Sequence, residues 1–132
     1  NDGMGEYVAY QVIKLMNKKG ILVKDSNILI LGITFKENCP DIRNTKIVDI
    51  HSTLLEYTSN ITIYDPWANP LEVMQEYHLK SLTQLDNTQK FDAIVLTVAH
   101  KDFQNLDLKQ FLKNEGIIYD VKGILKNGTK HP

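Results

Sequence analysis

The chain has 132 residues, of which 15 are lysine or arginine and 16 are aspartate or glutamate, so its formal net charge is −1. This length is typical of one domain, and the balanced charge creates no field that would favour nucleic acid or an anionic membrane surface. A single cysteine, Cys39, excludes an intrachain disulfide and a cysteine-rich zinc site, and no run approaches the roughly 20 apolar residues of a membrane span. These features predict a domain of a protein in the reducing cytoplasm.

The first residues, Asn-Asp-Gly-Met-Gly, lead directly into a segment with helical periodicity, residues 5–20. Because position 1 is not methionine, we interpret the chain as part of a longer protein that begins inside or just before a helix. We therefore expect residues 1–20 to form an entry helix and residues 21–132 to form the domain.

Apolar runs and amphipathic stretches alternate along the next half of the chain. The continuous apolar run at 27–33 predicts a central strand that is covered on both faces. An apolar face over residues 45–57 predicts a helix, and residues 61–64 predict a second strand. Residues 70–77 are expected to form a short helix.

The remaining segments continue the same alternation. Residues 79–82 predict a short strand, 93–98 a second buried strand, 106–113 a helix that stops at Gly116, and 117–120 the last strand. Strands joined by helices in this way imply right-handed crossovers and a parallel sheet. The predicted fold is a doubly wound, Rossmann-like α/β domain of three layers, with helices on both faces of the sheet.

In open parallel sheets, ligands bind beyond the carboxyl ends of the strands, near the point where the strand order reverses. That rule selects three loops, residues 34–44, 98–102 and 120–123. The first loop follows a single glycine, Gly32, where a dinucleotide fingerprint requires three, so a tight glycine turn cannot cradle a pyrophosphate there. The domain is therefore not expected to hold NAD by itself.

The first loop instead carries an aromatic ring beside a cation, Phe35 and Lys36, and the only arginine of the chain, Arg43. A ring can stack on a base, a lysine supplies a point charge, and an arginine offers a two-pronged donor to phosphate or carboxylate. Lys122 in the last loop is a second lysine at the same edge, and two converging lysines would clamp a phosphate. This pattern favours an anionic nucleotide.

A simpler interpretation of the first loop stays open at this point. Phe35 would cover the core, Lys36 would be solvated, and Arg43 would pair with Asp41.

The other reactive side chains are weaker candidates for a functional site. Cys39 has no adjacent histidine and lies near two carboxylates, so we do not expect it to be catalytic. Asp65 could bind a ribose hydroxyl, but an Asp-Pro corner favours a structural turn. His100 could act as a general base, although its place in the sequence shows no partner, which favours a surface or loop-packing residue. The other three histidines have no ligand spacing, so no metal site is predicted.

Four groups of residues together resemble a known family, the UDP-glucose/GDP-mannose dehydrogenases, in their carboxy-terminal domain. The resemblance covers essentially the whole chain and is closest to the branch that oxidises UDP-N-acetylhexosamines for capsule, Vi-type and O-antigen polysaccharides. The most specific group is the string Phe-Lys-Glu-Asn-Cys-Pro-Asp-Ile-Arg-Asn at 35–44. The other groups are Asn1-Asp2 with Met4 and Tyr7-Val8, then Tyr64-Asp65-Pro66, and finally Asp120-Val121-Lys122-Gly123-Ile124-Leu125.

The resemblance implies a division of labour between domains. An amino-terminal domain would bind NAD, a central helical domain would form a homodimer, and this domain would close over the UDP-sugar, with residues 1–20 as the tail of the central helix. The sugar C6 alcohol would be oxidised to a carboxylate by two hydride transfers to NAD, on a catalytic cysteine outside this chain. The resemblance assigns Phe35, Lys36 and Lys122 to the UDP-sugar and Arg43 to NAD, and it assigns no catalytic residue here.

Two alternatives belong to other classes of protein. A stand-alone nucleotide-binding or interaction module could share the fold, but the lack of an initial methionine disfavours it. A phosphorylatable receiver domain would need an acidic cluster after the first strand, where this sequence is basic and aromatic.

Overall fold

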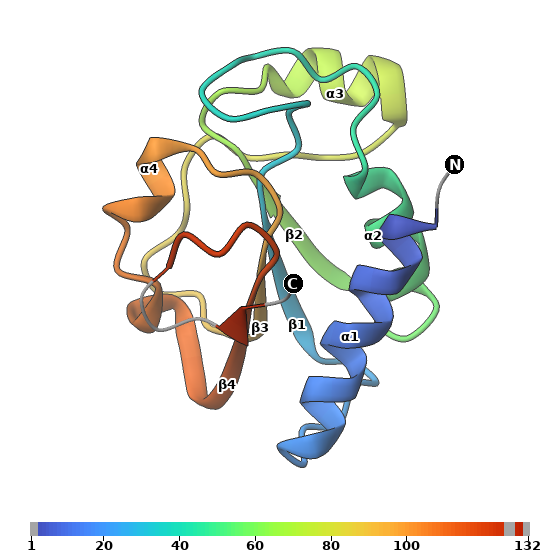
Figure 1. Ribbon diagram of the computed structural model, residues 1–132, viewed down its shortest axis with the longest axis vertical. Helices are drawn as coiled ribbons and strands as arrows, with labels where there is room; N and C mark the ends of the chain where they lie inside the picture. The colour runs from blue at the N-terminus through green and yellow to red at the C-terminus, as the bar shows by residue number, and fades with distance from the viewer. Residues whose placement is uncertain (1–2, 126–128, 131–132) are drawn as a thin grey trace.

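The computed structural model describes residues 3–125 and, for their backbone only, residues 129–130. Two layers of helix enclose one sheet (Figure 1). The helices are α1 (Met4–Lys18), α2 (Ile47–Leu55), α3 (Pro70–Tyr77), α4 (Lys101–Gln104) and a 3₁₀-helix (Leu108–Phe111), and the strands are β1 (Asn27–Leu31), β2 (Asn60–Tyr64), β3 (Phe91–Leu96), β4 (Leu112–Asp120) and β5 (Thr129–Lys130).

All pairings in the sheet are parallel, and the strand order is β2-β1-β3-β4-β5. Figure 1 shows α1 and α2 on one face and α4 on the other. The predicted doubly wound α/β fold is therefore confirmed. Because β2 lies on one side of β1 and β3 on the other, the strand order reverses between β1 and β3, and the ligand-binding edge is expected at their carboxyl ends.

Both faces of the sheet are buried, which explains the continuous apolar runs in β1 and β3. Along β1, Ile28 and Ile30 belong to the core beneath α1 and α2, whereas Leu29 and Leu31 belong to the core beneath α4 and the 3₁₀-helix. Successive residues of a strand point to opposite faces, so no position of such a strand can be polar without cost.

Helix α1 packs against α2 through a contact that requires a glycine. A Cβ added to Gly5 would lie 2.5 Å from Asp49 Cβ and 3.1 Å from the backbone nitrogen of Ile50. The two helix backbones therefore approach closely at the first turn of α1.

The prediction for the segment before β4 was partly wrong. Its helix is a single 3₁₀ turn, and β4 begins at Leu112 and runs through Gly116 instead of starting after it. Pairing of Leu112 with Phe91 of β3 extends the strand. Gly116 serves this pairing, because a Cβ there would lie 2.7 Å from Leu112 Cδ1 and 3.0 Å from the carbonyl oxygen of Asp92.

Three smaller features also differ from the prediction. The predicted strand at 79–82 is a single bridge between Tyr64 and Leu82. Helix α4 and strand β5 were not predicted, because each is too short to show a period.

Gly32 fixes the path of the chain as it leaves β1. Its φ is 105°, a conformation that favours glycine, and a Cβ there would lie 2.6 Å from Val98 Cβ in the loop after β3. The loops after β1 and β3 thus touch directly at the switch point.

We predict that Gly32→Ala destabilises the fold more than Gly20→Ala. Gly20 also has a positive φ, 76°, so both alanines incur the backbone cost of about 1–2 kcal/mol. Only the alanine at Gly32 collides with Val98, since nothing lies within 4 Å of a Cβ at Gly20. Overpacking should add about 1–3 kcal/mol, measured by urea unfolding. Val98→Ala should recover part of the loss at Gly32, and equal losses at the two glycines would contradict this account.

Candidate functional site

A pocket of about 120 Å³ lies at the switch point, where the loops after β1, β3 and β4 meet the first turn of α2. Three of the residues predicted to bind substrate, Phe35, Lys36 and Lys122, all line it. Sequence reasoning could not place them together from spacing alone, because Lys122 lies on a different loop. The other lining residues are Thr34, Glu37, Thr45, Lys46, Ile47, Thr97 and Val98.

The pocket presents positive charge and an exposed ring. Lys36 and Lys122 are exposed, and Phe35 is 56% exposed, so its ring does not cover the core. The amide of Ile47, in the first turn of α2, donates to Thr45 Oγ1 at 3.3 Å. Helix amino termini carry a partial positive charge, so α2 reinforces the lysines, and Glu37 is the opposing carboxylate in the lining. The arrangement suits an anion that is joined to a planar ring.

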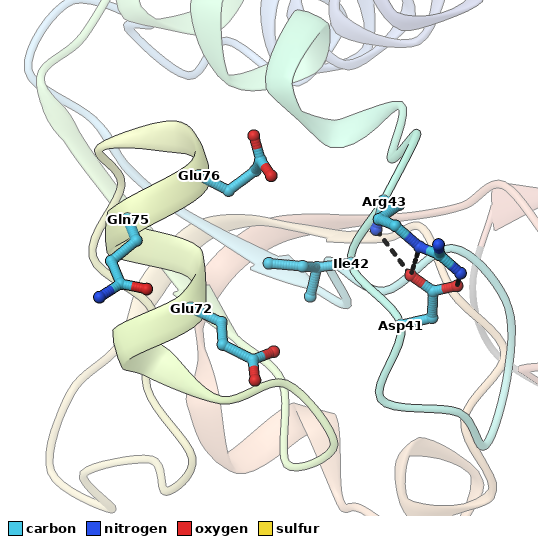
Figure 2. Close-up of a pocket in the computed structure, with 6 residues that line it drawn as sticks. All are labelled: Asp41, Ile42, Arg43, Glu72, Gln75 and Glu76. Carbon is cyan, nitrogen blue, oxygen red and sulfur yellow. Dashed lines mark hydrogen bonds and ion pairs between the residues drawn. The ribbon is translucent and has the colours of Figure 1, made fainter.

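Arg43 lies in a second, wider pocket of about 380 Å³, between the first loop and α3. Figure 2 shows it turned towards Asp41, with Glu72, Gln75 and Glu76 of α3 opposite. The guanidinium donates from Nε and Nη2 to the two carboxylate oxygens of Asp41 at 3.0 and 2.9 Å.

These hydrogen bonds from Arg43 lower the pKa of Asp41 to about 2. The pairing of Arg43 with Asp41, which the sequence left as an alternative, is therefore present. The Arg43 side chain remains 80% exposed.

Two buried side chains, the carboxylate of Asp65 and the imidazole of His100, support the first loop. Asp65, directly after β2, accepts hydrogen bonds at Oδ2 from the amides of Ile33 and Thr34, at 2.7 and 3.2 Å, and from His100 Nε2 at 3.0 Å. Its Oδ1 accepts from the amide of Trp67 at 2.7 Å. Both Asp65 and His100 are 0% exposed. The structural role favoured for these two residues is confirmed.

Competing effects set the charge of Asp65. Burial acts to raise the pKa of the carboxyl group, but the hydrogen bonds from His100 and from the amides of Ile33 and Trp67 outweigh it. The net pKa lies below the ordinary value of 3.8, so Asp65 is ionised at neutral pH.

Sequence reasoning missed that Asp65 and His100 are partners, because 35 residues separate them. A usable signal existed, since each follows a strand that flanks β1, and the carboxyl ends of parallel strands meet at one edge.

The remaining candidates form no further site. Cys39 is half-buried in the first loop. Within residues 3–125, no group of three metal-ligating side chains comes together, and His131 lies outside the described residues. In that same part of the chain, no helix is long and apolar enough to cross a bilayer.

The fold is thus a doubly wound α/β domain with a basic pocket at its switch point, where nucleotide-binding domains of this class place their ligands, and with one glycine after β1 in place of the three of a dinucleotide fingerprint. Residues 29–127 match the UDP-glucose/GDP-mannose dehydrogenase family, UDP binding domain. The chain belongs to this family.

Several relatives share the whole length of this chain but extend well beyond it. UDP-N-acetyl-D-glucosamine 6-dehydrogenases of Salmonella typhi and Pseudomonas aeruginosa are 44% and 41% identical to it, over 95% of the chain and 30% of each relative. Protein CapL of Staphylococcus aureus is 38% identical over 96% of the chain and 30% of that protein. The chain thus spans about 30% of the length of these relatives.

Solved structures agree with the fold. The NDP-N-acetyl-D-galactosaminuronic acid dehydrogenase of Methanosarcina mazei superposes with a TM-score of 0.81, at 20% identity, over 96% of this chain and 26% of that one. The UDP-D-ManNAc dehydrogenase of Pyrococcus horikoshii gives a TM-score of 0.76 at 20% identity, over 96% of this chain and 29% of that one.

We predict that Asp65→Asn destabilises the protein by about 3 kcal/mol or more at neutral pH, because an amide cannot accept all of the hydrogen bonds that converge on the carboxylate. Since folding lowers the pKa of Asp65, its stabilisation is present above the unfolded value of 3.8 and is lost as the pH falls through the folded value. The variant should therefore lose less stability on acidification than the wild type.

Urea unfolding at neutral pH and at about pH 3 tests this difference. Asp86→Asn is the matched control, because Asp86 is an exposed carboxylate that is hydrogen-bonded only locally, to Thr88. Parallel pH dependence for Asp65→Asn and the wild type would refute the assignment.

Proposed function

We propose that the switch-point pocket binds the uridine diphosphate group of a UDP-N-acetylhexosamine, and that the chain is the carboxy-terminal, substrate-binding domain of an NAD-dependent 6-dehydrogenase. One observation carries this proposal. Phe35, Lys36 and Lys122 line one pocket at the first turn of α2, in a chain of the UDP-glucose/GDP-mannose dehydrogenase family.

Each part of the pocket has a role in this proposal. Lys36 and Lys122 neutralise the diphosphate as point charges, and the amino terminus of α2 adds its partial positive charge. The exposed ring of Phe35 stacks on the uracil. A substrate held at its nucleotide end presents its sugar at a fixed distance, so the domain contributes orientation to the reaction.

The chemistry itself is proposed to occur outside this chain. The full-length enzyme would oxidise the sugar C6 alcohol to the uronic acid, in the cytoplasm, for surface polysaccharide biosynthesis. Its catalytic cysteine and its homodimer contacts would lie in preceding domains, with residues 1–20 as the end of the central helix. The names of the relatives from Salmonella and Pseudomonas support an N-acetylated UDP-hexosamine as the substrate.

The residues of this chain do not fit an NAD pyrophosphate. Val98 fills the space beside Gly32, so this glycine serves loop packing and not the approach of a phosphate. The long loop 32–46 also replaces the tight turn between strand and helix that a dinucleotide site needs. We therefore assign NAD to another domain, and we propose that Arg43 contacts it from the wider pocket across a shared cleft.

Titration of the chain with UDP tests the assignment of the pocket. Binding should be weak, in the millimolar range, because only half of the site is present, and Lys36→Ala should weaken it about tenfold through loss of a charge-assisted contact. Lys24→Ala removes another exposed lysine, before β1, and should leave the affinity unchanged. Equal affinities for Lys36→Ala and the wild type would count against the proposed site.

A second expectation concerns catalysis. The isolated chain, mixed with NAD and UDP-N-acetylglucosamine, should produce no NADH, because the proposed catalytic groups lie in other domains. Absorbance at the NADH band over several hours measures this, with a full-length relative as the positive control. Turnover by the pure chain would overturn the division of labour between domains.

A further inference from the structure

The segment Phe35–Lys36–Glu37, which lines the pocket, is held on both sides by one buried side chain, His100. On the amino-terminal side, His100 Nε2 lies 3.1 Å from Thr34 Oγ1, and this hydroxyl donates to the carbonyl oxygen of Lys36 at 3.0 Å. On the carboxy-terminal side, His100 Nδ1 accepts the amide of Asn38 at 2.9 Å. The imidazole therefore brackets the three residues that carry the ring and the charge.

The hydrogen-bond partners define the tautomer of His100. A backbone amide can only donate, so Nδ1, which faces the amide of Asn38, carries no proton. An ionised carboxylate can only accept, so Nε2, which faces Asp65 Oδ2 at 3.0 Å, carries one. His100 is thus neutral and protonated on Nε2, which makes it a donor towards the sheet and an acceptor towards the loop.

Packing holds the imidazole ring in this orientation. The ring of Trp67 stacks on it at 5.8 Å between centroids and 21° between planes, and Phe103 meets it edge-on at 5.3 Å. Trp67 is itself held by a hydrogen bond from Nε1 to Asp102 Oδ1 at 2.7 Å. The ring cannot turn to exchange its two nitrogens without displacing these neighbours.

The backbone conformation of Asn38 needs stabilisation by residues outside its own loop. Its φ is +55°, a conformation that asparagine tolerates at some cost, and its side chain is exposed. Its Oδ1 accepts the amide of Lys101 at 2.8 Å, so this bond and the one from its amide to His100 both lead to the segment after β3. This left-handed turn lies two residues after Lys36 in the same loop.

We propose that His100 is a positioning residue for the UDP site, and that its unprotonated Nδ1, by accepting the amide of Asn38, holds Phe35 and Lys36 in the orientation that binds the nucleotide. This inference rests on the proposed function of the pocket. His100 itself does not line that pocket. It acts through the backbone of residues 34–38, from a position with no exposed surface.

Two substitutions test the roles of the two His100 nitrogens separately. In H100Q, the amide nitrogen lies as many bonds from Cα as Nε2 does, so the donor to Asp65 is kept while the acceptor for Asn38 is lost. In H100N, the amide oxygen replaces Nδ1, so the acceptor is kept while Asp65 loses its donor.

The proposal predicts that UDP affinity depends mainly on the acceptor Nδ1 of His100, and that stability depends mainly on the donor Nε2. H100Q should weaken UDP binding about fivefold and speed hydrogen exchange at the amide of Asn38, with a smaller loss of stability than in H100N. H100N should retain more of the UDP affinity while losing more stability. A merely structural role would lower affinity and stability together in both variants. H78N, on the exposed end of α3, is the control and should change neither.

Titration with UDP, thermal unfolding and amide exchange by NMR give these readouts, and imidazole ¹⁵N shifts report the tautomer in the wild-type chain. Unchanged UDP affinity in H100Q, or a wild-type His100 protonated on Nδ1, would overturn the positioning role alone. Failure of the wild-type chain to bind UDP would overturn the proposed function, and this inference with it. If H100Q does not fold, rapid exchange of the Asn38 amide in the wild type still refutes the proposal.

Discussion

The ionised carboxylate of Asp65 holds together the loops at the carboxyl edge of the sheet. It is completely buried, and a buried charge is tolerated only where hydrogen bonds surround it. Four donors do so, from the end of β1, from the turn after β2 and from the loop after β3. A single charge therefore ties together three segments that are distant in sequence, in the place where a parallel sheet reverses its order.

The same edge explains how the domain can serve a nucleotide without a glycine fingerprint. A fingerprint brings a phosphate to the backbone of a tight turn, which requires empty space beside its glycines. Here Val98 occupies the space beside Gly32, and the chain continues into a long loop before α2. In the proposed function, charged side chains replace those backbone contacts, and Lys36 and Lys122 come from two loops that line one pocket at this edge.

The sequence predicted the fold well wherever burial produced a period. The strands β1 and β3 showed as unbroken apolar runs because both faces are covered, and α3 was placed at its observed bounds by Pro70 and by its short amphipathic face. The start of β4 was missed, because Lys113, Asn114 and Glu115 are exposed at an end of the sheet and carry no strand pattern. Tertiary pairing with β3 overrides local propensity there.

The residues of the candidate site were also predicted only in part from the sequence. Residue type and loop position made Phe35, Lys36 and Lys122 candidates at a predictable edge of the sheet, and the family resemblance was needed to assign them to a UDP-sugar. Type and position were not enough to separate Arg43 from that group, since Arg43 lies in a different pocket only through the turn of the loop at Asp41. Loop packing was expected for His100, but its partners were not, because its bonds to Asp65 and Asn38 depend on three-dimensional proximity that no local pattern encodes.

The glycine contact between α1 and α2 has a mechanical consequence. Because the two backbones touch at Gly5, neither helix can slide or roll along the other without separating, and α2 begins at the wall of the pocket. The first turn of α1 and the first turn of α2, which lines the pocket, are therefore fixed relative to one another. A shift of α1 would have to carry this wall of the pocket with it.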